Sequence, residues 1–136
     1  MMRHHAAIVS VALFAALGVF QAALAAGMPA GQYAWGGRFS GSLPDSLRWA
    51  SLAALPVLAA AAWVILARAD LARPGSGGRP VRAGAWCITA FLALNVVGNL
   101  LSASAAERQV MAPLALLLLT GCGIVAASPA KPRQPG

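Results

Sequence analysis

The chain has 136 residues, of which 60% are hydrophobic and only 10% are charged, and its mean hydropathy is +0.73. A typical soluble domain is about 45–50% apolar and about 25% charged. This composition therefore excludes an ordinary soluble globule, a disordered chain and a nucleic-acid-binding domain with a charged face. The net charge is +7, and in so apolar a chain basic residues belong to the short loops on the cytoplasmic side of a membrane. We expect no nucleic-acid partner.

Four apolar runs dominate the sequence. Each is close to the roughly 20 residues that a helix needs to cross a bilayer, and none contains Asp, Glu, Lys, Arg or His. They are too long for membrane β-strands and do not alternate, and in hydrocarbon a helix satisfies its own backbone. The predicted fold is an all-α, membrane-embedded bundle of four transmembrane helices in residues 1–128, followed by a disordered cytoplasmic tail, 129–136. The predicted spans are about 6–26, 49–67, 83–101 and 110–127.

The first run can also be interpreted as a signal peptide. It follows a basic start and contains Ala23-Leu24-Ala25 near its end, which is the A-x-A pattern of a cleavage site. The run is long for the apolar part of a signal peptide, so we expect an uncleaved first helix. Cleavage would leave three spans.

The Lys and Arg residues are divided unequally between the two sides that the spans define. Seven lie in the two tails and the middle connection, against three in the other two loops. Because positive residues favour the cytoplasmic side, both termini are predicted to be cytoplasmic. The middle connection, residues 73–80, is predicted to be a flexible basic linker. The seven are Arg3, Arg68, Arg73, Arg79, Arg82, Lys131 and Arg133, and the three are Arg38, Arg48 and Arg108.

The loop between the first two spans holds many of the unusual residues of the predicted outer side. Glycines and a proline punctuate it, and Tyr33, Trp35 and Arg38 lie among them. Such a loop could line a ligand site. We favour the simpler interpretation, a compact re-entrant or interfacial loop that packs its aromatic rings at the headgroup level. At its end, Asp45 or Ser46 is predicted to cap the second helix.

Polar residues follow one face of the third span. Asn95, Asn99 and Ser102 are spaced i, i+4, i+7, and Gly98 and Ser102 add a pair of small residues beside them. Amides are costly against lipid, so we expect this face to point into the bundle. There the amides would bind other helices, which is the commoner outcome, or line a polar pocket open to the outside.

The turn between the third and fourth spans matches the S/T-x-x-E capping box at Ser104 and Glu107. The Ser104 hydroxyl would accept a hydrogen bond from the Glu107 amide, and the Glu107 carboxylate would accept one from the Ser104 amide. Arg108 would reach headgroups or Asp45. A lone carboxylate without a His, Cys or Ser partner set is weak evidence for acid–base catalysis, so a structural role is predicted for Glu107.

The histidines and cysteines do not form a metal-binding pattern in the sequence. His4 and His5 are adjacent on a short tail with no neighbouring Cys, Asp or Glu, which makes a poor metal site. If the third and fourth spans are antiparallel neighbours, Cys87 and Cys122 lie at a similar depth. We interpret them as small residues at a helix interface and not as a redox pair. We expect no cofactor.

Three segments together resemble a group of small four-helix integral membrane proteins, mostly uncharacterised, from bacteria with GC-rich genomes. The strong preference for arginine and alanine agrees with such a genome. The resemblance implies four helices, an uncleaved first span and a bacterial plasma (inner) membrane; it implies no activity, cofactor or catalytic residue. The segments are Gly27…Ala34-Trp35-Gly36-Gly37-Arg38, Leu43-Pro44…Leu47-Arg48 and Asn99…Ser102-x-Ser104-x-x-Glu107-Arg108…Pro113.

Three functional hypotheses follow. The first, which we favour, is a non-enzymatic scaffold or accessory subunit of a membrane complex, whose partners are the lipid bilayer and another membrane protein or a second copy. The second is a transporter or binder of a small solute with an outward-facing polar pocket. The third, a membrane enzyme, would use Asp45, Glu107 and Arg108. The candidate residues of an outer polar site are Tyr33, Trp35, Arg38, Asn95, Asn99, Glu107 and Arg108.

Overall fold

The computed structural model describes residues 1–72 and 78–129. The described part of the chain is all-helical and contains no strand, and its four long helices have the length and hydropathy to cross a membrane. Most of the predicted linker and nearly all of the predicted tail lie outside the described residues. The elements are α1 (Met2–Ala25), a 3-10 turn η1 (Gly31–Tyr33), α2 (Asp45–Arg68), α3 (Arg79–Leu100), a π-helical turn η2 (Glu107–Met111) and α4 (Ala112–Ala127).

Each helix contains most of one apolar run, and prolines mark several of the helix starts. Pro80 lies in the first turn of α3, where a missing backbone N–H costs nothing, and Pro113 lies two residues after the π-helical turn η2. Pro44 is the residue that flanks the start of α2, Asp45 is already helical, and no side chain caps this helix. The predicted cap at Asp45 or Ser46 is therefore wrong, because the fixed φ of Pro44 starts the helix one residue earlier.

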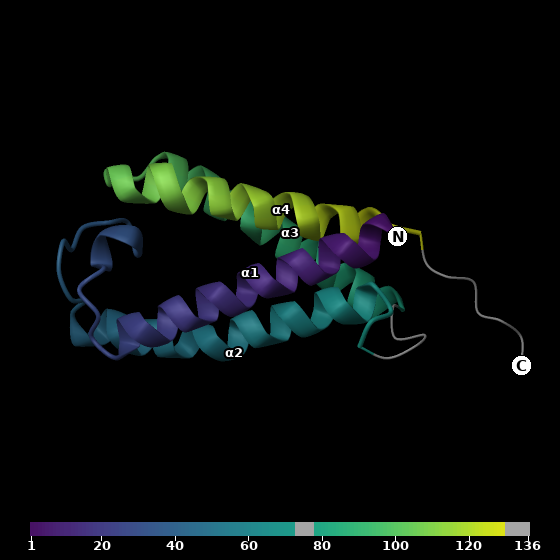
Figure 1. Ribbon diagram of the computed structural model, residues 1–136, viewed down its shortest axis with the longest axis horizontal. Helices are drawn as coiled ribbons and strands as arrows, with labels where there is room; N and C mark the ends of the chain where they lie inside the picture. The colour runs from purple at the N-terminus through teal and green to yellow at the C-terminus, as the bar shows by residue number, and fades with distance from the viewer. Residues whose placement is uncertain (73–77, 130–136) are drawn as a thin grey trace, which may run out of the picture.

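The helices form two closely packed pairs, α1 with α2 and α3 with α4. The pairs are joined mainly where α1 contacts α4, and α2 contacts α3 less extensively. Figure 1 shows the pairs converging where the N-terminus lies and diverging at the opposite end, where the long loop lies. We call these the terminal end and the loop end of the bundle.

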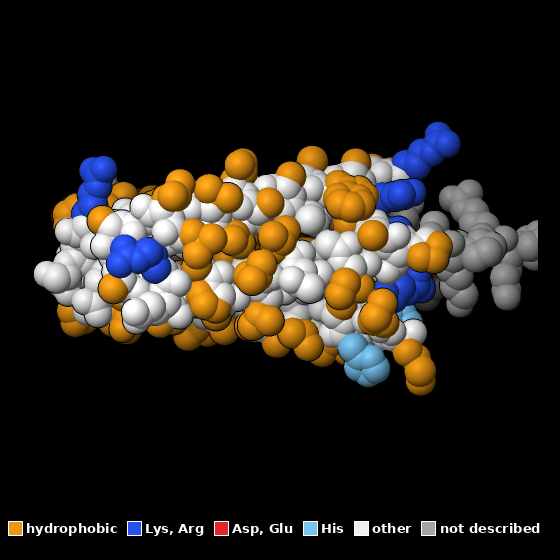
Figure 2. Space-filling view, turned by 90° about the horizontal axis from the view of Figure 1, so that it is seen from above, with side chains coloured by type: hydrophobic (Ala, Val, Ile, Leu, Met, Phe, Trp, Pro, Cys, Tyr) orange, Lys and Arg blue, Asp and Glu red, His pale blue; other side chains and the backbone are white. Residues whose placement is uncertain are grey.

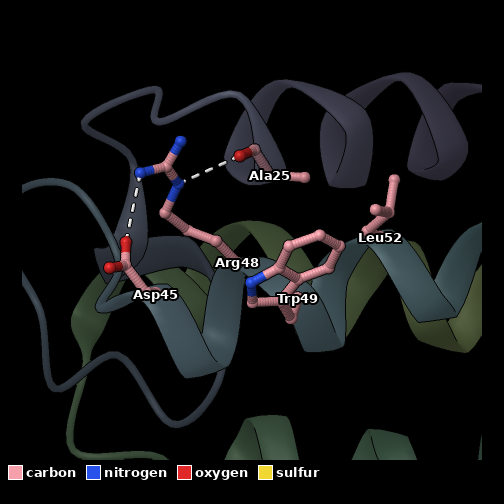
Figure 3. A pocket seen from close by; sticks show the side chains of 5 residues that line it. All are labelled: Ala25, Asp45, Arg48, Trp49 and Leu52. Carbon is pink, nitrogen blue, oxygen red and sulfur yellow. Dashed lines mark hydrogen bonds and ion pairs between the residues drawn. The ribbon is translucent and has the colours of Figure 1, made fainter.

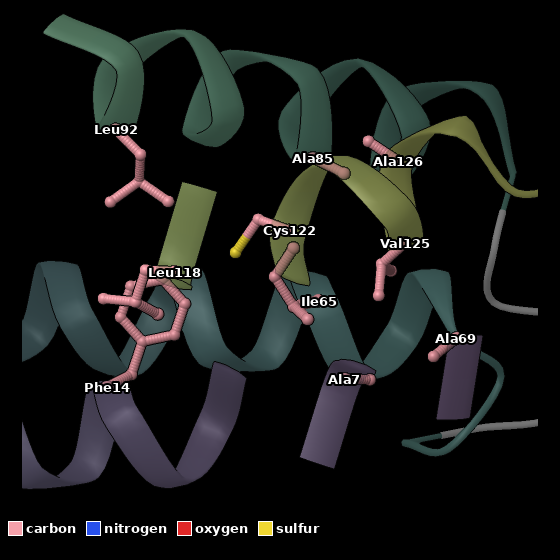
Figure 4. Close-up of a cluster of buried hydrophobic side chains, with 10 residues drawn as sticks. All are labelled: Ala7, Phe14, Ile65, Ala69, Ala85, Leu92, Leu118, Cys122, Val125 and Ala126. Atoms are coloured by element: carbon pink, nitrogen blue, oxygen red, sulfur yellow. The ribbon is translucent and has the colours of Figure 1, made fainter. Parts of the chain in front are cut away.

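The main buried core is made of small and aliphatic side chains from all four helices, with one aromatic ring, Phe14 (Figure 4). Alanine is its commonest member, and Cys122 is buried there, whereas Cys87 is exposed. The helices α1 and α4 approach closely at Gly121, where a Cβ would lie 2.3 Å from Ser10 Oγ of α1. There is therefore no room for a larger side chain at this position. Small residues at helix contacts are typical of membrane bundles. The core members are Ala7, Phe14, Ile65, Ala69, Ala85, Leu92, Leu118, Cys122, Val125 and Ala126.

The outer surface is apolar along the middle of the bundle. Figure 2 shows hydrophobic side chains over this region and Lys and Arg side chains only towards the two ends. Large side chains such as Val19, Phe91 and Leu94 are well exposed on α1 and α3. This distribution fits a chain whose middle faces hydrocarbon, since exposed apolar surface of this extent is unusual on a soluble monomer.

Candidate functional site: the loop end of the bundle

The loop between α1 and α2 is folded on itself. The Gly31 amide donates a hydrogen bond to the Gly41 carbonyl oxygen at 3.0 Å, and a Cβ on Gly31 would lie 2.7 Å from the Phe39 carbonyl oxygen. Ala34 and Leu43 from the loop pack with Leu24 of α1 in a second, smaller buried cluster. The loop is therefore a compact body attached to the end of α1, as the sequence predicts.

Three consecutive residues in this loop adopt a left-handed backbone. Trp35, Gly36 and Gly37 have φ values of +56°, +82° and +64°. This conformation costs little for glycine but about 1–2 kcal/mol for a residue with a Cβ. Gly37 is also required by space, because a Cβ there would lie 2.1 Å from the Ser104 Cβ. The strained turn thus presents its backbone directly to the α3–α4 turn.

Hydrogen bonds fasten the loop to the α3–α4 turn. The Ser104 hydroxyl donates to the Gln32 carbonyl oxygen at 2.7 Å, and the Ser102 hydroxyl donates to the Gly36 carbonyl oxygen at 3.4 Å. The Gly36 amide donates to Glu107 Oε1 at 3.1 Å. These contacts join segments that are 66 to 72 residues apart in the chain.

Trp35 connects the same loop to the other helix pair. Its indole Nε1 donates to Ser51 Oγ of α2 at 3.0 Å, and Ser51 is fully buried. The neighbouring residue, Gly36, contacts Glu107 in η2. The Trp35-Gly36 step therefore links α2 to the start of the fourth helix, at the end where Figure 1 shows the two pairs apart.

Half of the predicted capping box is present. The Glu107 amide donates to Ser104 Oγ at 3.4 Å, as the sequence predicts. The reciprocal bond is wrong: the Ser104 amide donates to Ser102 Oγ, and the Glu107 carboxylate accepts from Gly36. The Glu107 carboxylate, which the capping-box pattern predicts to bind the Ser104 amide, instead binds the backbone of the α1–α2 loop at Gly36.

Glu107 and Arg108 differ sharply in their surroundings. Glu107 is 3% exposed and lies in the π-helical turn η2, a distortion that often marks functional positions. Arg108 is exposed, and its guanidinium donates to the Ser102 carbonyl oxygen rather than to Asp45. Asp45 pairs instead with Arg48, Oδ1 to Nη1 at 3.3 Å. The two carboxylates of the enzyme hypothesis thus have separate partners.

The amide face of α3 does not point into the bundle. Asn95 is exposed, Asn99 is half-buried, and Asn99 Nδ2 donates to Asn95 Oδ1 at 3.1 Å. At the terminal end, Gly84 on the same helical face packs against Val64 of α2. Because the two pairs diverge towards the loop end, Asn95 further along this face is left uncovered. The expectation that Asn95 faces the bundle is therefore wrong.

Two other predicted site residues, Tyr33 and Arg38, differ in their exposure. Tyr33 is half-buried in η1, and Arg38 is exposed. A hollow of about 200 Å³ does lie at the loop end, but it contains none of the seven predicted residues. It is lined by Ala25, Asp45, Arg48, Trp49 and Leu52.

A polar cluster at the terminal end has no counterpart in the sequence predictions. Arg3 of α1 forms a salt bridge with Asp70 at 3.1 Å, and both side chains are largely buried. Arg68 is 1% exposed and donates to the Ser128 carbonyl oxygen after α4. Asp70 is the informative signal, because it is the single acidic residue of the sequence at this basic end. These contacts tie the start of α1 to the ends of α2 and α4.

Comparisons with protein-family models, with curated proteins and with solved structures gave no match. Within residues 1–72 and 78–129, no three His, Cys, Asp or Glu side chains are grouped in a way that could hold a metal ion.

Proposed function

We propose that this protein is a non-enzymatic subunit of a membrane assembly and that α3 binds a transmembrane helix of the partner. One observation carries the proposal. Among the four candidate spans, α3 has the lowest hydropathy, 1.5 against 2.2 for each of the others. It is also the least buried, at 11% against 17%, 22% and 39%.

A chain that is alone in lipid should show the opposite relationship, because the most exposed helix meets the most hydrocarbon. Polar groups in a span favour a position against protein, where hydrogen bonds across helices contribute about 0.6–2 kcal/mol each. Asn95 is such a group on the uncovered face. A partner helix that supplies a hydrogen-bonding side chain at this depth would resolve the mismatch.

The neighbouring residues suit a helix–helix contact. Phe91, Asn95 and Gly98 share one face of α3 and are all exposed, and nothing lies within 4 Å of a Cβ placed on Gly98. On α2, Val57 is 65% exposed and lies seven residues from Val64, on the face of α2 that contacts Gly84. A glycine beside an amide permits close backbone approach, so the side between α2 and α3 can accept one more helix.

The test is photocrosslinking in the native membrane. A photoreactive residue at Phe91 should yield a discrete protein adduct, whereas one at Leu117 of α4 should not; these two side chains have similar exposure, 65% and 61%. Asn95→Leu should abolish the Phe91 adduct. The matched control is Thr120→Leu, which makes a similar polar-to-apolar change at an exposed position of α4. Lipid adducts alone at Phe91, or a protein adduct that persists in Asn95→Leu, would overturn the proposal.

For location we propose a bacterial plasma membrane with both termini and the α2–α3 connection on the cytoplasmic side. The support is the excess of Lys and Arg on that side of the predicted spans. Reporter fusions after Gly78 and after Gly136 should both report cytoplasm. A periplasmic signal from the fusion after Gly78 would reverse the orientation.

A further inference from the structure

The hollow at the loop end combines a fixed cation, an exposed anion and an apolar wall. It lies between the last turn of α1 and the first turns of α2 (Figure 3). Asp45 and Arg48 form its charged part, and Trp49 and Leu52 form its apolar part. At 1.5 Å rise per residue, Asp45 and Leu52 are about 10 Å apart along the helix.

Arg48 is held in place by the fold. Its Nε donates to the Ala25 carbonyl oxygen at 3.0 Å and its Nη1 pairs with Asp45. The remaining nitrogen, Nη2, lies close to Gly27: a Cβ added to Gly27 would be 3.5 Å from it. Within the described part of the chain Nη2 has no hydrogen-bond partner. A positioned guanidinium with a free donor is suited to a phosphate oxygen.

Asp45 offers the complementary charge beside it. Its side chain is 89% exposed, and only Oδ1 is engaged, with Arg48. The free carboxylate oxygen can accept hydrogen bonds from a cation that still carries N–H groups. One ligand that presents a phosphate and an ammonium a few atoms apart would satisfy both side chains.

The apolar part of the hollow lies on the side of the first turns of α2 that leads into the span. Trp49 is 70% exposed and Leu52 is 44% exposed, one turn further into the span. A tryptophan at this position is typical of the boundary between headgroups and hydrocarbon. An acyl chain attached to the ligand would therefore lie along Trp49 and Leu52.

We propose that this hollow binds a phospholipid with an ethanolamine headgroup. The phosphate binds Arg48, the primary ammonium binds Asp45, and an acyl chain packs along Trp49 and Leu52. A choline headgroup has no N–H to donate to Asp45. A glycerol headgroup carries no cation, so its phosphate meets the Asp45 carboxylate unfavourably. The inference requires that the helices cross a bilayer, but it does not depend on a partner for α3.

Native mass spectrometry of the full chain in detergent tests this directly. The protein is offered equal amounts of ethanolamine, choline and glycerol phospholipids with the same acyl chains. We expect the ethanolamine lipid to be retained about fivefold over the choline lipid, because both headgroups are cationic and differ by about one hydrogen bond to Asp45. Free phosphoethanolamine should not displace it, because it makes no contact with Trp49 and Leu52.

The deciding variant is Asp45→Ala, which removes the carboxylate acceptor at a side chain that is 89% exposed. It should remove the preference for ethanolamine over choline and raise retention of the glycerol lipid. Arg38→Gln is the matched control, since it alters an exposed charge at the same end that does not line the hollow. Equal retention of the three lipids by the unaltered protein would overturn the proposal. So would an ethanolamine preference that survives Asp45→Ala, or displacement of the lipid by free phosphoethanolamine.

Discussion

Gly37 lies so close to Ser104 that a Cβ on Gly37 would be 2.1 Å from the Ser104 Cβ. No Cβ contact in a folded protein is that short, so the α1–α2 loop can rest on the α3–α4 turn only with glycine at this position. The contact sits beside the hydrogen bond from Ser104 Oγ to the Gln32 carbonyl oxygen. The loop end of the bundle therefore depends both on the close contact between Gly37 and Ser104 and on hydrogen bonds.

Gly37→Ala is expected to detach the loop from the turn. Both the left-handed backbone and the clash with Ser104 oppose the substitution, and we expect a loss of more than about 2 kcal/mol of stability. Gly36→Ala is the matched control, because Gly36 also has positive φ but nothing lies within 4 Å of its Cβ position. It should cost only about 1–2 kcal/mol. Thermal unfolding in detergent compares the two, and equal losses would contradict the close approach.

Replacing Trp35 by Phe isolates the hydrogen bond that joins the loop to α2. The substitution keeps an aromatic ring and removes the Nε1 donor to the buried Ser51 hydroxyl. We expect a loss of about 1–3 kcal/mol, because the buried Ser51 hydroxyl is left without its donor. In Ser51→Ala the same change at Trp35 should have a smaller effect. If the Trp35→Phe cost is unchanged in the Ser51→Ala background, the bond does not stabilise the fold.

The Arg3–Asp70 pair should contribute measurably to stability, unlike the Asp45–Arg48 pair. The side chains of Arg3 and Asp70 are 20% and 17% exposed, whereas the Asp45 side chain is 89% exposed. Exposed pairs are worth about 0–1 kcal/mol, whereas removing one partner of a more buried pair leaves an uncompensated charge and costs more. Double-mutant cycles on unfolding in detergent should therefore give a coupling above about 1 kcal/mol for Arg3 with Asp70 and a smaller one for Asp45 with Arg48. The reverse order would contradict the burial of the terminal-end pair.

The elements of the fold are predictable from the sequence because they depend on local properties. A long apolar run without charges has few alternatives to a helix in hydrocarbon, and each of the four runs is helical in the structure. The bond from the Glu107 amide to Ser104 Oγ is equally local, and the capping-box pattern predicts it correctly.

The candidate site was less predictable because its contacts join distant segments. The Glu107 carboxylate binds Gly36, 71 residues away, and no local pattern indicates that the loop would take it from the cap. Helical periodicity predicts which face of α3 carries Asn95. It does not predict that Asn95 is exposed, because the exposure depends on how far the two helix pairs diverge. Asp70 shows its role only when α1 brings Arg3 beside it.

The first helix is expected to remain attached to the mature protein. Ala7 and Phe14 belong to the main core, Leu24 is buried beneath the loop, and the Ala25 carbonyl oxygen accepts the hydrogen bond from Arg48. Cleavage at the A-x-A pattern would remove these contacts and leave Arg48 Nε without its acceptor. Intact-mass measurement of the purified protein should give the uncleaved chain, and a variant with Ala23 and Ala25 replaced by Leu, which lacks the pattern, should keep the same N-terminus. A mature N-terminus at Ala26 would show instead that α1 is a signal peptide and that the bundle assembles from three helices.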